Sequence, residues 1–309
     1  MNPSEQKRNI SKVIILGHTG FIGDYVIRRF EAAHPDYELI GLSSRALDLT
    51  EERAVHTLSE LADERTAIIM CSAIKRHVED SLRAFQLNMK MAINLVQFLQ
   101  ENSIARFLYF SSVSVYGENR NDLAITEATP IRPITYYGIA KYSSECLFNK
   151  VLEERDDFSL VTLRPSLVYG PGDECEHYRP SAFVKSILST QSLEIWGDGQ
   201  EKRDFIYVKD IAELTYRLTF NQFEGTINLV TGESHSFNQV IDTLAEVIPE
   251  KLTLNHIPRT RPKVSQGFNN EKIIHLFNDF KFTPFTDGIK ETYKIVRKQF
   301  NGASEKIGT

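Results

Sequence analysis

The first half of the chain alternates between short apolar runs and longer stretches in which apolar residues recur at helical spacing. Each run of four or five residues is typical of a strand that is buried on both faces of a parallel sheet. The predicted strands are Val13–Leu16, Glu38–Leu42, Ala67–Cys71, Phe107–Phe110 and Leu160–Leu163. The predicted helices are Phe21–Phe30, a segment that begins near Thr50, Leu82–Leu99 and Gly138–Glu154. This alternation predicts an α/β fold with a doubly wound parallel sheet and helices on both of its faces.

Two of the predicted helices carry more specific expectations. Thr50 is placed to cap the second helix, whose first turn carries Glu51 and Glu52 at the positive end of the helix dipole. In the third helix, apolar residues recur along one face at helical spacing. These residues are Leu82, Phe85, Met89, Ile93 and Val96.

The pattern changes after Tyr169, where the turn cluster Gly170–Asp173 is followed by shorter and more mixed elements. We therefore predict a large domain over residues 1–169 and a smaller mixed α/β portion over residues 170–309 that mainly binds the substrate. The smaller portion need not be contiguous. Phe205–Val208 and Ile227–Val230 look like strands that could return to the large sheet.

The composition is that of an ordinary globular protein, with 41% apolar and 25% charged residues. The net charge of −5 predicts no general attraction to nucleic acid or to anionic membranes. Cys71, Cys146 and Cys175 are too scattered for a disulfide framework or a zinc site, so no metal is expected. The polar start of the chain and the lack of an apolar stretch of about 18 residues predict a cytoplasmic protein without a membrane span.

Three glycines follow the first predicted strand directly, in the arrangement G-x-x-G-x-x-G. They are Gly17, Gly20 and Gly23. Glycine here permits a tight turn and close approach of a pyrophosphate, while the helix that follows supplies free N–H groups and the positive end of its dipole. Within a βαβ unit this spacing predicts a Rossmann-type dinucleotide site that includes Thr19, Phe21 and Ile22. A purely structural turn is the alternative.

The end of the second strand indicates which dinucleotide binds. An NAD-binding chain usually has Asp or Glu there, which binds the ribose 2′-hydroxyl. This chain has Ser43, Ser44 and Arg45 instead, a set that suits a 2′-phosphate. We therefore predict NADP(H), with NAD(H) as the alternative if Arg45 is only a solvated loop residue. Asp48 and Leu49 are expected near the adenine.

Tyr137 and Lys141 form a Y-x-x-x-K pair on the predicted fourth helix, whereas Tyr136 has Ala140 four residues later. Positions four apart share a helix face, so the lysine ammonium is expected near the tyrosine hydroxyl. That charge favours the phenolate, which suits a tyrosine that exchanges a proton with a substrate oxygen. Ser112 follows the fourth strand, where its hydroxyl could orient the same oxygen toward Tyr137.

Further motifs accompany these in a fixed order along nearly the whole chain. They are S-S-x-x-V-Y-G at Ser111–Gly117, Leu163-Arg164-Pro165 followed by Val168–Gly172, and Arg203–Val208. Together the motifs resemble those of extended short-chain dehydrogenase/reductases, the sugar-nucleotide epimerase/dehydratase family. The resemblance implies that Ser112 is the catalytic serine, that Tyr137 is the acid/base and that Lys141 binds the nicotinamide ribose and tunes Tyr137.

The same resemblance suggests a further cofactor contact after the third strand. Lys75, with Ala73 before it, falls where some epimerases carry a lysine near the cofactor phosphates. A surface lysine is the alternative.

The resemblance also narrows the reaction. Relatives that are 4,6-dehydratases carry Thr-Asp-Glu where this chain has Ser112-Val113-Ser114, so the acids needed for water elimination are missing. The Ser-Ser-Arg segment is more like NADPH-using reductases such as GDP-fucose synthase, whose catalytic Cys corresponds to Ser114 and whose His resembles His177. We therefore predict NADPH-dependent reduction of a nucleoside-diphosphate-4-keto-6-deoxyhexose, for an activated deoxysugar of a surface polysaccharide.

Arginines are the expected ligands of the substrate diphosphate, because their forked donors match its oxygens. By resemblance these are Arg203 and Arg261, with Arg179 as a further candidate. Trp196, the only tryptophan, could line the base or ribose pocket or simply pack, and His177 could contact a hydroxyl or phosphate or be an inert surface residue. Nothing separates dTDP from GDP, UDP or CDP; dTDP is our first choice because such keto intermediates are frequent in that series.

Two other functions stay open. One is an NAD-dependent 4-epimerase, which returns the hydride to its substrate. The other is a non-enzymatic NADP-binding sensor, although Ser112, Tyr137 and Lys141 are all present. Relatives commonly form homodimers through the helices that correspond to Leu82–Leu99 and Gly138–Glu154, and we expect a homodimer here. The apolar residues beyond a single stripe on those helices are Met91, Leu95, Cys146 and Phe148.

Overall fold

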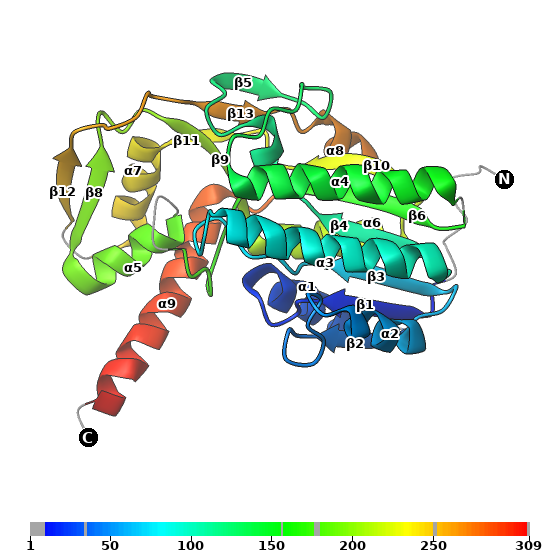
Figure 1. The fold of residues 1–309 in the computed structure, drawn as a ribbon. Coiled ribbons are helices and arrows are strands. Elements are labelled where there is room, and N and C mark those ends of the chain that lie inside the picture. The colour runs from blue at the N-terminus through cyan, green and yellow to red at the C-terminus, as the bar shows by residue number, and fades with distance from the viewer. Residues whose placement is uncertain (1–9, 34–35, 156, 176–179, 250–251, 308–309) are drawn as a thin grey trace. The chain divides into compact units, whose positions relative to one another are not determined.

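The computed structural model describes residues 10–33, 36–155, 157–175, 180–249 and 252–307. The chain folds into two compact units, each assembled from separate stretches of sequence. Unit 1 contains Met1–Asn119, Glu127–Pro165 and Ile211–Leu229. Unit 2 contains Arg120–Thr126, Ser166–Asp210 and Val230–Thr309. Figure 1 labels the helices and strands of both units.

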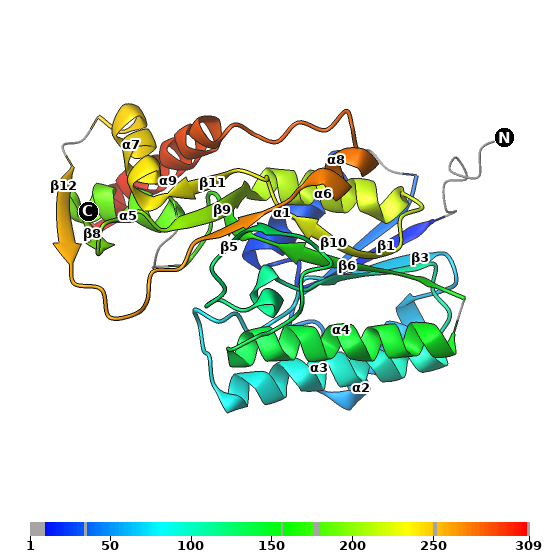
Figure 2. The same ribbon diagram turned by 90° about the horizontal axis from the view of Figure 1, so that it is seen from above.

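Unit 1 is built on a six-stranded parallel sheet in the order β10-β6-β4-β3-β1-β2. The strands are β1 (Lys12–Leu16), β2 (Glu38–Leu42), β3 (Thr66–Met70), β4 (Arg106–Phe110), β6 (Ser159–Pro165) and β10 (Gly225–Leu229). The helices are α1 (Phe21–Glu31), α2 (Glu52–Leu61), α3 (Leu82–Glu101), α4 (Tyr136–Glu154) and most of α6 (Val208–Phe220). Figure 2 shows α2, α3 and α4 below the sheet and α1 and α6 above it. The prediction of an α/β protein with a doubly wound Rossmann-type sheet is therefore confirmed.

Burial explains why the apolar runs predicted these strands. Every residue of β3, β4 and β6 is buried, because helices cover both faces of the sheet and leave no solvent-facing side. The core on the α3–α4 side packs Ile14, Leu95 and Phe98 with the rings of Phe107 and Phe148, whose centroids lie 4.8 Å apart. This packing anchors α3 and α4 on one face of the sheet, and the predicted site residues follow the carboxyl ends of its strands.

Helix α3 is present, but the face on which its apolar residues recur at helical spacing is not its buried face. Leu82 and Ile93 are 55% and 46% exposed, and Phe85, Met89 and Val96 are only half-buried. The buried face instead carries Ala84, Asn88, Met91, Ala92, Asn94, Leu95, Phe98 and Leu99. Two asparagines can occupy this face because their side-chain amides are hydrogen-bonded: Asn88 to the backbone of Ile74, and Asn94 to the carbonyl of Leu49.

The predicted cap of the second helix is also wrong. Helix α2 begins at Glu52, and its N-cap residue is Glu51, which makes no side-chain capping bond. Thr50 lies outside the helix because its N–H and hydroxyl both donate to the carboxylate of Asp48, at 2.9 and 2.8 Å. This local turn competes with capping for the threonine hydroxyl.

Unit 2 contains three small sheets. Strands β7 (Leu167–Tyr169), β9 (Lys202–Tyr207) and β11 (Ser234–Ser236) form one; β8 (Ser192–Trp196) pairs with β12 (Thr253–Ile257), and β5 (Asp122–Ile125) pairs with β13 (Gln266–Phe268). Its helices are α5 (Pro180–Thr190), α7 (Phe237–Val247), α8 (Glu271–Leu276) and α9 (Phe285–Ile307). The expectation that Phe205–Val208 returns to the large sheet is wrong: residues 205–207 belong to β9, which pairs with β7 and β11, while β10 does join the large sheet.

A buried carboxylate explains why β9 pairs in this way. Asp204 accepts hydrogen bonds from the Ser166 hydroxyl at 2.6 Å, from the N–H and hydroxyl of Thr231 and from the N–H of Gly232. Ser166 directly precedes β7 and Thr231 follows β10, so one side chain of β9 binds both segments. A buried carboxylate requires such donors, and they hold β9 beside β7.

Candidate active site

The glycine turn has the geometry of a phosphate cradle. Gly17 has φ +83°, and a Cβ on it would lie 2.7 Å from the Ser72 hydroxyl. A Cβ on Gly23 would lie 2.2 Å from the carbonyl oxygen of Gly17, so both positions require glycine. Gly20 is the N-cap of α1 and has no side chain to occupy the N–H groups of its first turn. These residues fit a dinucleotide, whose pyrophosphate the free N–H groups would bind.

The segment after β2 contains the residues that were predicted to favour NADP(H) over NAD(H). The carbonyl of Ser43 accepts the N–H groups of Ala46 and Leu47, which makes a turn that leaves Ser44 and Arg45 exposed. Three residues after Arg45, the Asp48 carboxylate accepts the two hydrogen bonds from Thr50 that are described above. Leu49 is buried in the core, and its contact with an adenine stays a prediction.

Lys75 lies beside the glycine turn. Its Nζ is 5.9 Å from the centroid of the Phe21 ring, in the first turn of α1. The segment from Ala73 to Lys75 is held by Asn88, whose side-chain amide accepts the N–H of Ile74 at 2.8 Å and donates to its carbonyl at 3.0 Å. Asn88 was not predicted; a polar residue on the inner face of a helix is the signal that could have indicated it.

The structure brings Tyr137 and Lys141 together near the segment that carries Ser112. Lys141 is 5% exposed; its Nζ donates to the carbonyl of Phe110 at 2.6 Å and lies 5.7 Å from the centroid of the Tyr137 ring. Ser112 follows Phe110 by two residues, and its Oγ accepts the N–H of Ser114 at 3.1 Å. The backbone N–H of Tyr137 donates to the Asp80 carboxylate at 3.0 Å, which fixes the start of α4.

Burial lowers the pKa of Lys141 to about 8, against an ordinary value of 10.5, and the nearby Cys71 and Glu145 side chains partly oppose this shift. Lys141 is therefore a cation below about pH 8 and loses its charge at a far lower pH than a surface lysine. The same burial raises the pKa of the Cys71 thiol to about 12, so this cysteine stays protonated beside the lysine.

A pH profile tests whether the Lys141 charge matters for turnover. Because the cation is lost as pH rises through about 8, we expect kcat to fall over that range. The Lys141→Arg variant keeps its charge, so its remaining activity should persist to higher pH. A wild-type profile that stays flat up to pH 10.5, the ordinary lysine value, would contradict this role.

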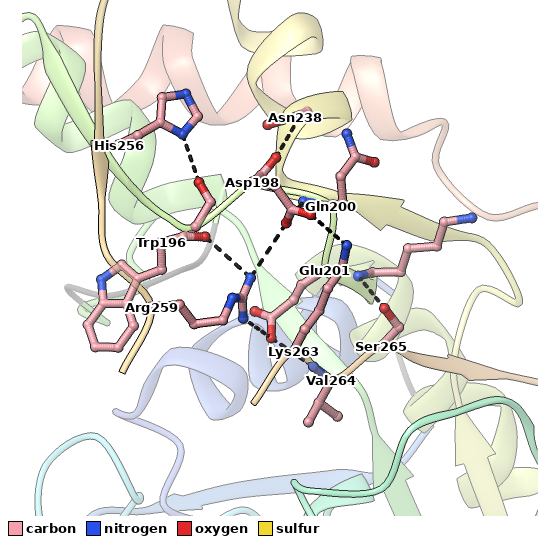
Figure 3. A network of polar contacts seen from close by, with 12 residues as sticks. Trp196, Asp198, Gln200, Glu201, Asn238, His256, Arg259, Lys263, Val264 and Ser265 are labelled. Atoms are coloured by element: carbon pink, nitrogen blue, oxygen red, sulfur yellow. Dashed lines mark hydrogen bonds and ion pairs between the residues drawn. The ribbon is translucent and has the colours of Figure 1, made fainter. Parts of the chain in front are cut away.

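The predicted substrate ligands of unit 2 lie on two segments, residues 196–203 and 256–265, and Figure 3 shows Trp196 and hydrogen bonds between the two segments. Trp196 ends β8, and its carbonyl accepts a hydrogen bond from Arg259 at 3.3 Å. Arg203, on β9, donates to the carbonyl oxygens of Lys202 and Val264. Arg261 is exposed between β12 and β13. Two further predicted ligands, His177 and Arg179, lie outside the described residues.

Arg259 was not predicted, and it organises this part of unit 2 (Figure 3). Its guanidinium donates to Glu201 at 2.6 Å and lies 3.7 Å from Asp198, which also binds Lys263 at 2.8 Å. A Cβ on Gly197, which has φ +63°, would lie 2.8 Å from the Nε of Arg259. Carboxylates therefore neutralise Arg259 and Lys263, whereas Arg261, between them, has no such partner in the described part of the chain.

No cluster of three or more His, Cys, Asp or Glu side chains among the described residues has the arrangement of a metal site. None of the helices in those residues combines the length and the apolar character that crossing a bilayer requires.

Comparison with known proteins identifies the family. The model of the NAD dependent epimerase/dehydratase family matches residues 13–229. GDP-L-colitose synthase of Yersinia pseudotuberculosis is 25% identical over 265 residues, covering 78% of this chain and 83% of the relative. GDP-6-deoxy-D-talose 4-dehydrogenase of Aggregatibacter actinomycetemcomitans is 26% identical over 291 residues, covering 92% and 97%. The structure of Thermus thermophilus UDP-glucose 4-epimerase in complex with NAD superposes with a TM-score of 0.80 at 22% identity, covering 93% and 99%. The chain therefore belongs to the NAD dependent epimerase/dehydratase family.

Proposed function

We propose that the chain is an NADPH-dependent reductase that converts the 4-keto group of a nucleoside-diphosphate-linked 4-keto-6-deoxyhexose to a hydroxyl, in the biosynthesis of a deoxysugar for surface polysaccharide. The observation that carries the proposal is the buried Lys141 beside Tyr137 and the Ser112 segment, in the same unit as the glycine turn. The exposed Ser44 and Arg45 after β2, in place of an acid, support NADPH over NADH.

The residues of unit 1 supply the proton and the orientation for this reaction. Reduced nicotinamide, when bound, supplies the hydride that adds to C4. The Tyr137 hydroxyl gives its proton to the 4-oxygen, so the carbonyl gains one hydride and one proton and becomes a secondary alcohol. The Ser112 hydroxyl donates a hydrogen bond to the same oxygen and aligns it. Lys141, anchored on the Phe110 carbonyl, holds its charge beside Tyr137 while the proton leaves.

The name of one relative, GDP-6-deoxy-D-talose 4-dehydrogenase, supports a reaction at C4 of a 6-deoxy sugar. The names of this relative and of the colitose synthase both contain GDP, so GDP joins dTDP as a nucleoside diphosphate to test. For the diphosphate we propose Arg203 and Arg261, which forms no ion pair with the described residues, with Trp196 near the base. His177 and Arg179 remain proposals from the sequence.

The runner-up is a 4-epimerase, which would use the same Tyr137 and Lys141 pair and return the hydride to the opposite face of the sugar. The family model and the fold are shared with epimerases, so net cofactor consumption is the property that separates the two reactions. Dehydration is not proposed, because Val113 and Ser114 cannot act as the acid and base of water elimination.

We also propose that the protein forms a homodimer through α3 and α4. Met91, Leu95 and Phe148, three of the residues on which the expectation rests, pack inside unit 1 and cannot form an interface. The large apolar side chains that are exposed instead are Leu82 and Ile93 of α3 and Tyr136, Ile139 and Tyr142 of α4, two helices in mutual contact. Light scattering should give twice the chain mass for the wild type and a monomer for Ile93→Glu; a monomeric wild type would overturn the dimer.

The Arg45→Ala variant tests the cofactor assignment. Because the guanidinium would bind only a 2′-phosphate, we expect KM for NADPH to rise roughly 10- to 100-fold while KM for NADH stays nearly constant. Arg53→Ala, on the exposed face of α2, is the matched control and should change neither value. An equal effect of Arg45→Ala on both cofactors would contradict the assignment.

The reaction itself is tested by mixing the protein with NADPH or NADH and a freshly generated dTDP- or GDP-linked 4-keto-6-deoxyhexose, and following the absorbance of reduced nicotinamide. Substrate-dependent loss of the NADPH signal, faster than with NADH, is the expected result. Interconversion of UDP-hexoses without net oxidation would favour the epimerase instead. Cofactor binding with no turnover of either kind would indicate the sensor.

A further inference from the structure

Helix α4 carries a third side chain on the face that presents Tyr137 and Lys141. Glu145 is four residues beyond Lys141, and it is only 3% exposed. Its carboxylate accepts hydrogen bonds from the Ser111 hydroxyl and from Arg164, whose Nε is 3.0 Å away. A charge buried to this extent is tolerated only when it is paired and hydrogen-bonded, and Arg164, itself 5% exposed, supplies the pairing.

Arg164 continues the network in a second direction. Its third nitrogen donates to the Tyr116 hydroxyl at 2.8 Å, and that hydroxyl donates to the side-chain oxygen of Asn228 at 2.8 Å. Both Tyr116 and Asn228 are buried, so no solvent competes for these hydrogen bonds. The ion pair is therefore bonded to Ser111, the residue that follows β4, to the 3₁₀ turn η2 (Val113–Tyr116) through Tyr116, and to β10 through Asn228.

The two residues bound by the pair flank the residue proposed to orient the substrate oxygen. Ser111 directly precedes Ser112, and Tyr116 ends the turn that Ser112 caps. Glu145 binds Ser111, on one side of Ser112, and Arg164 binds Tyr116, on the other side. Glu145 itself belongs to the helix that carries Tyr137 and Lys141. One buried ion pair thus connects the catalytic helix to both ends of the Ser112 segment.

We propose that Glu145 and Arg164 are positioning residues that fix the Ser112 hydroxyl relative to Tyr137 and Lys141. The inference rests on the proposed function, because it takes Ser112, Tyr137 and Lys141 as the catalytic residues. Neither member of the pair touches the substrate. The pair acts by keeping two hydroxyl groups, those of Ser111 and Tyr116, at fixed points of the segment.

Deleting those two hydroxyls tests the inference better than deleting a charge. Glu145→Gln or Arg164→Met leaves its partner charged and buried, so it would test stability first. Ser111→Ala and Tyr116→Phe each remove one hydroxyl and keep the ion pair and the ring packing. For the double variant we expect kcat to fall roughly 10- to 100-fold, since a displacement of about 1 Å has an effect of that size, with KM for NADPH unchanged.

A double-mutant cycle separates positioning from general weakening of the fold. In the Ser112→Ala background, the Ser111→Ala and Tyr116→Phe changes should lower kcat no further, because the group they position is already absent. An equal loss in both backgrounds would overturn the proposal. Tyr37→Phe, which removes a tyrosine hydroxyl bonded to the Phe30 carbonyl before β2, is the matched control and should leave kcat unchanged.

Crystal structures of the wild type and of the Ser111→Ala/Tyr116→Phe variant test the inference without any measurement of the reaction. The separation between the Ser112 Oγ and the Tyr137 hydroxyl should change in the variant; an unmoved Ser112 overturns the inference whatever the enzyme catalyses. If the wild type does not oxidise NADPH with any 4-keto sugar nucleotide, the proposed function fails, and these structures alone decide the inference.

Discussion

Replacing Tyr137 with phenylalanine is expected to lower kcat by roughly 1,000-fold while NADPH binding stays within about twofold of the wild type. The change removes only the hydroxyl that would give its proton to the 4-oxygen. The ring, 5.7 Å from the Lys141 ammonium, stays in place, and so does the bond from the Lys141 Nζ to the Phe110 carbonyl. Single-turnover absorbance measurements give the rate, and quenching or enhancement of NADPH fluorescence gives the affinity.

The neighbouring tyrosine provides a matched control for this experiment. Tyr136 is 43% exposed and, unlike Tyr137, has no lysine four residues beyond it. Tyr136→Phe should therefore keep full activity. Loss of turnover in both variants to the same extent would mean that the start of α4, and not the Tyr137 hydroxyl, is what the reaction needs.

Replacing Arg164 with methionine is expected to lower the free energy of unfolding by about 3–5 kcal/mol. The substitution leaves the Glu145 carboxylate buried, with the Ser111 hydroxyl as its remaining donor among those described above. Urea denaturation followed by far-ultraviolet circular dichroism measures the change. Replacing both members of the pair by methionine should restore much of the stability, because no uncompensated charge then stays in the core, but the turnover should stay low.

An exposed arginine of the same unit is the control for that measurement. Arg28 pairs with Asp24 at 3.0 Å on the surface of α1, where the two side chains are 69% and 39% exposed. Arg28→Met should change the free energy of unfolding by less than about 1 kcal/mol, since solvent screens the pair. If Arg164→Met has no larger effect than Arg28→Met, the buried network does not hold the Ser112 segment.

The sheet could be predicted from the sequence because its strands are buried on both faces. A continuous apolar run such as Val13–Leu16, between a polar start and a glycine turn, is typical of such a strand. Strand pairing in unit 2 was harder to predict, because the end of β9 and the residue after it form an apolar run, Phe205–Val208, like that of a central strand. Its place beside β7 depends on the bonds that Asp204 makes to Ser166 and Thr231, which are distant in the sequence.

The buried face of α3 shows where counting apolar residues fails. Asn88 and Asn94 are buried because each finds backbone partners in three dimensions, at Ile74 and at Leu49. The apolar Leu82 and Ile93 stay exposed, which agrees with the proposed dimer surface. Periodicity alone assigns every apolar residue to the core and every amide to solvent. For α3 it therefore indicates the wrong buried face.

The candidate site could be predicted where its residues lie on one helix, because their spacing in the sequence then determines which side chains are close together. Tyr137 and Lys141 needed only the four-residue repeat, and Glu145 continues that repeat, so the same reasoning could have found it. The basic residues of unit 2 differ, because Arg259 and Arg261 are indistinguishable in sequence. Only the carboxylates of Glu201 and Asp198 separate the neutralised arginine from the exposed one.

In a ketoreductase, hydride passes from NADPH to C4 of the keto sugar nucleotide and stays there. NADPH that carries deuterium at the transferable position of its nicotinamide ring makes this transfer visible, with the product sugar analysed by mass spectrometry and NMR. We expect one deuterium on C4 for each NADPH oxidised, and roughly 1,000-fold less labelled product from the Tyr137→Phe variant over the same time. Product without deuterium, or a 4-epimer formed with no net oxidation of NADPH, would contradict it.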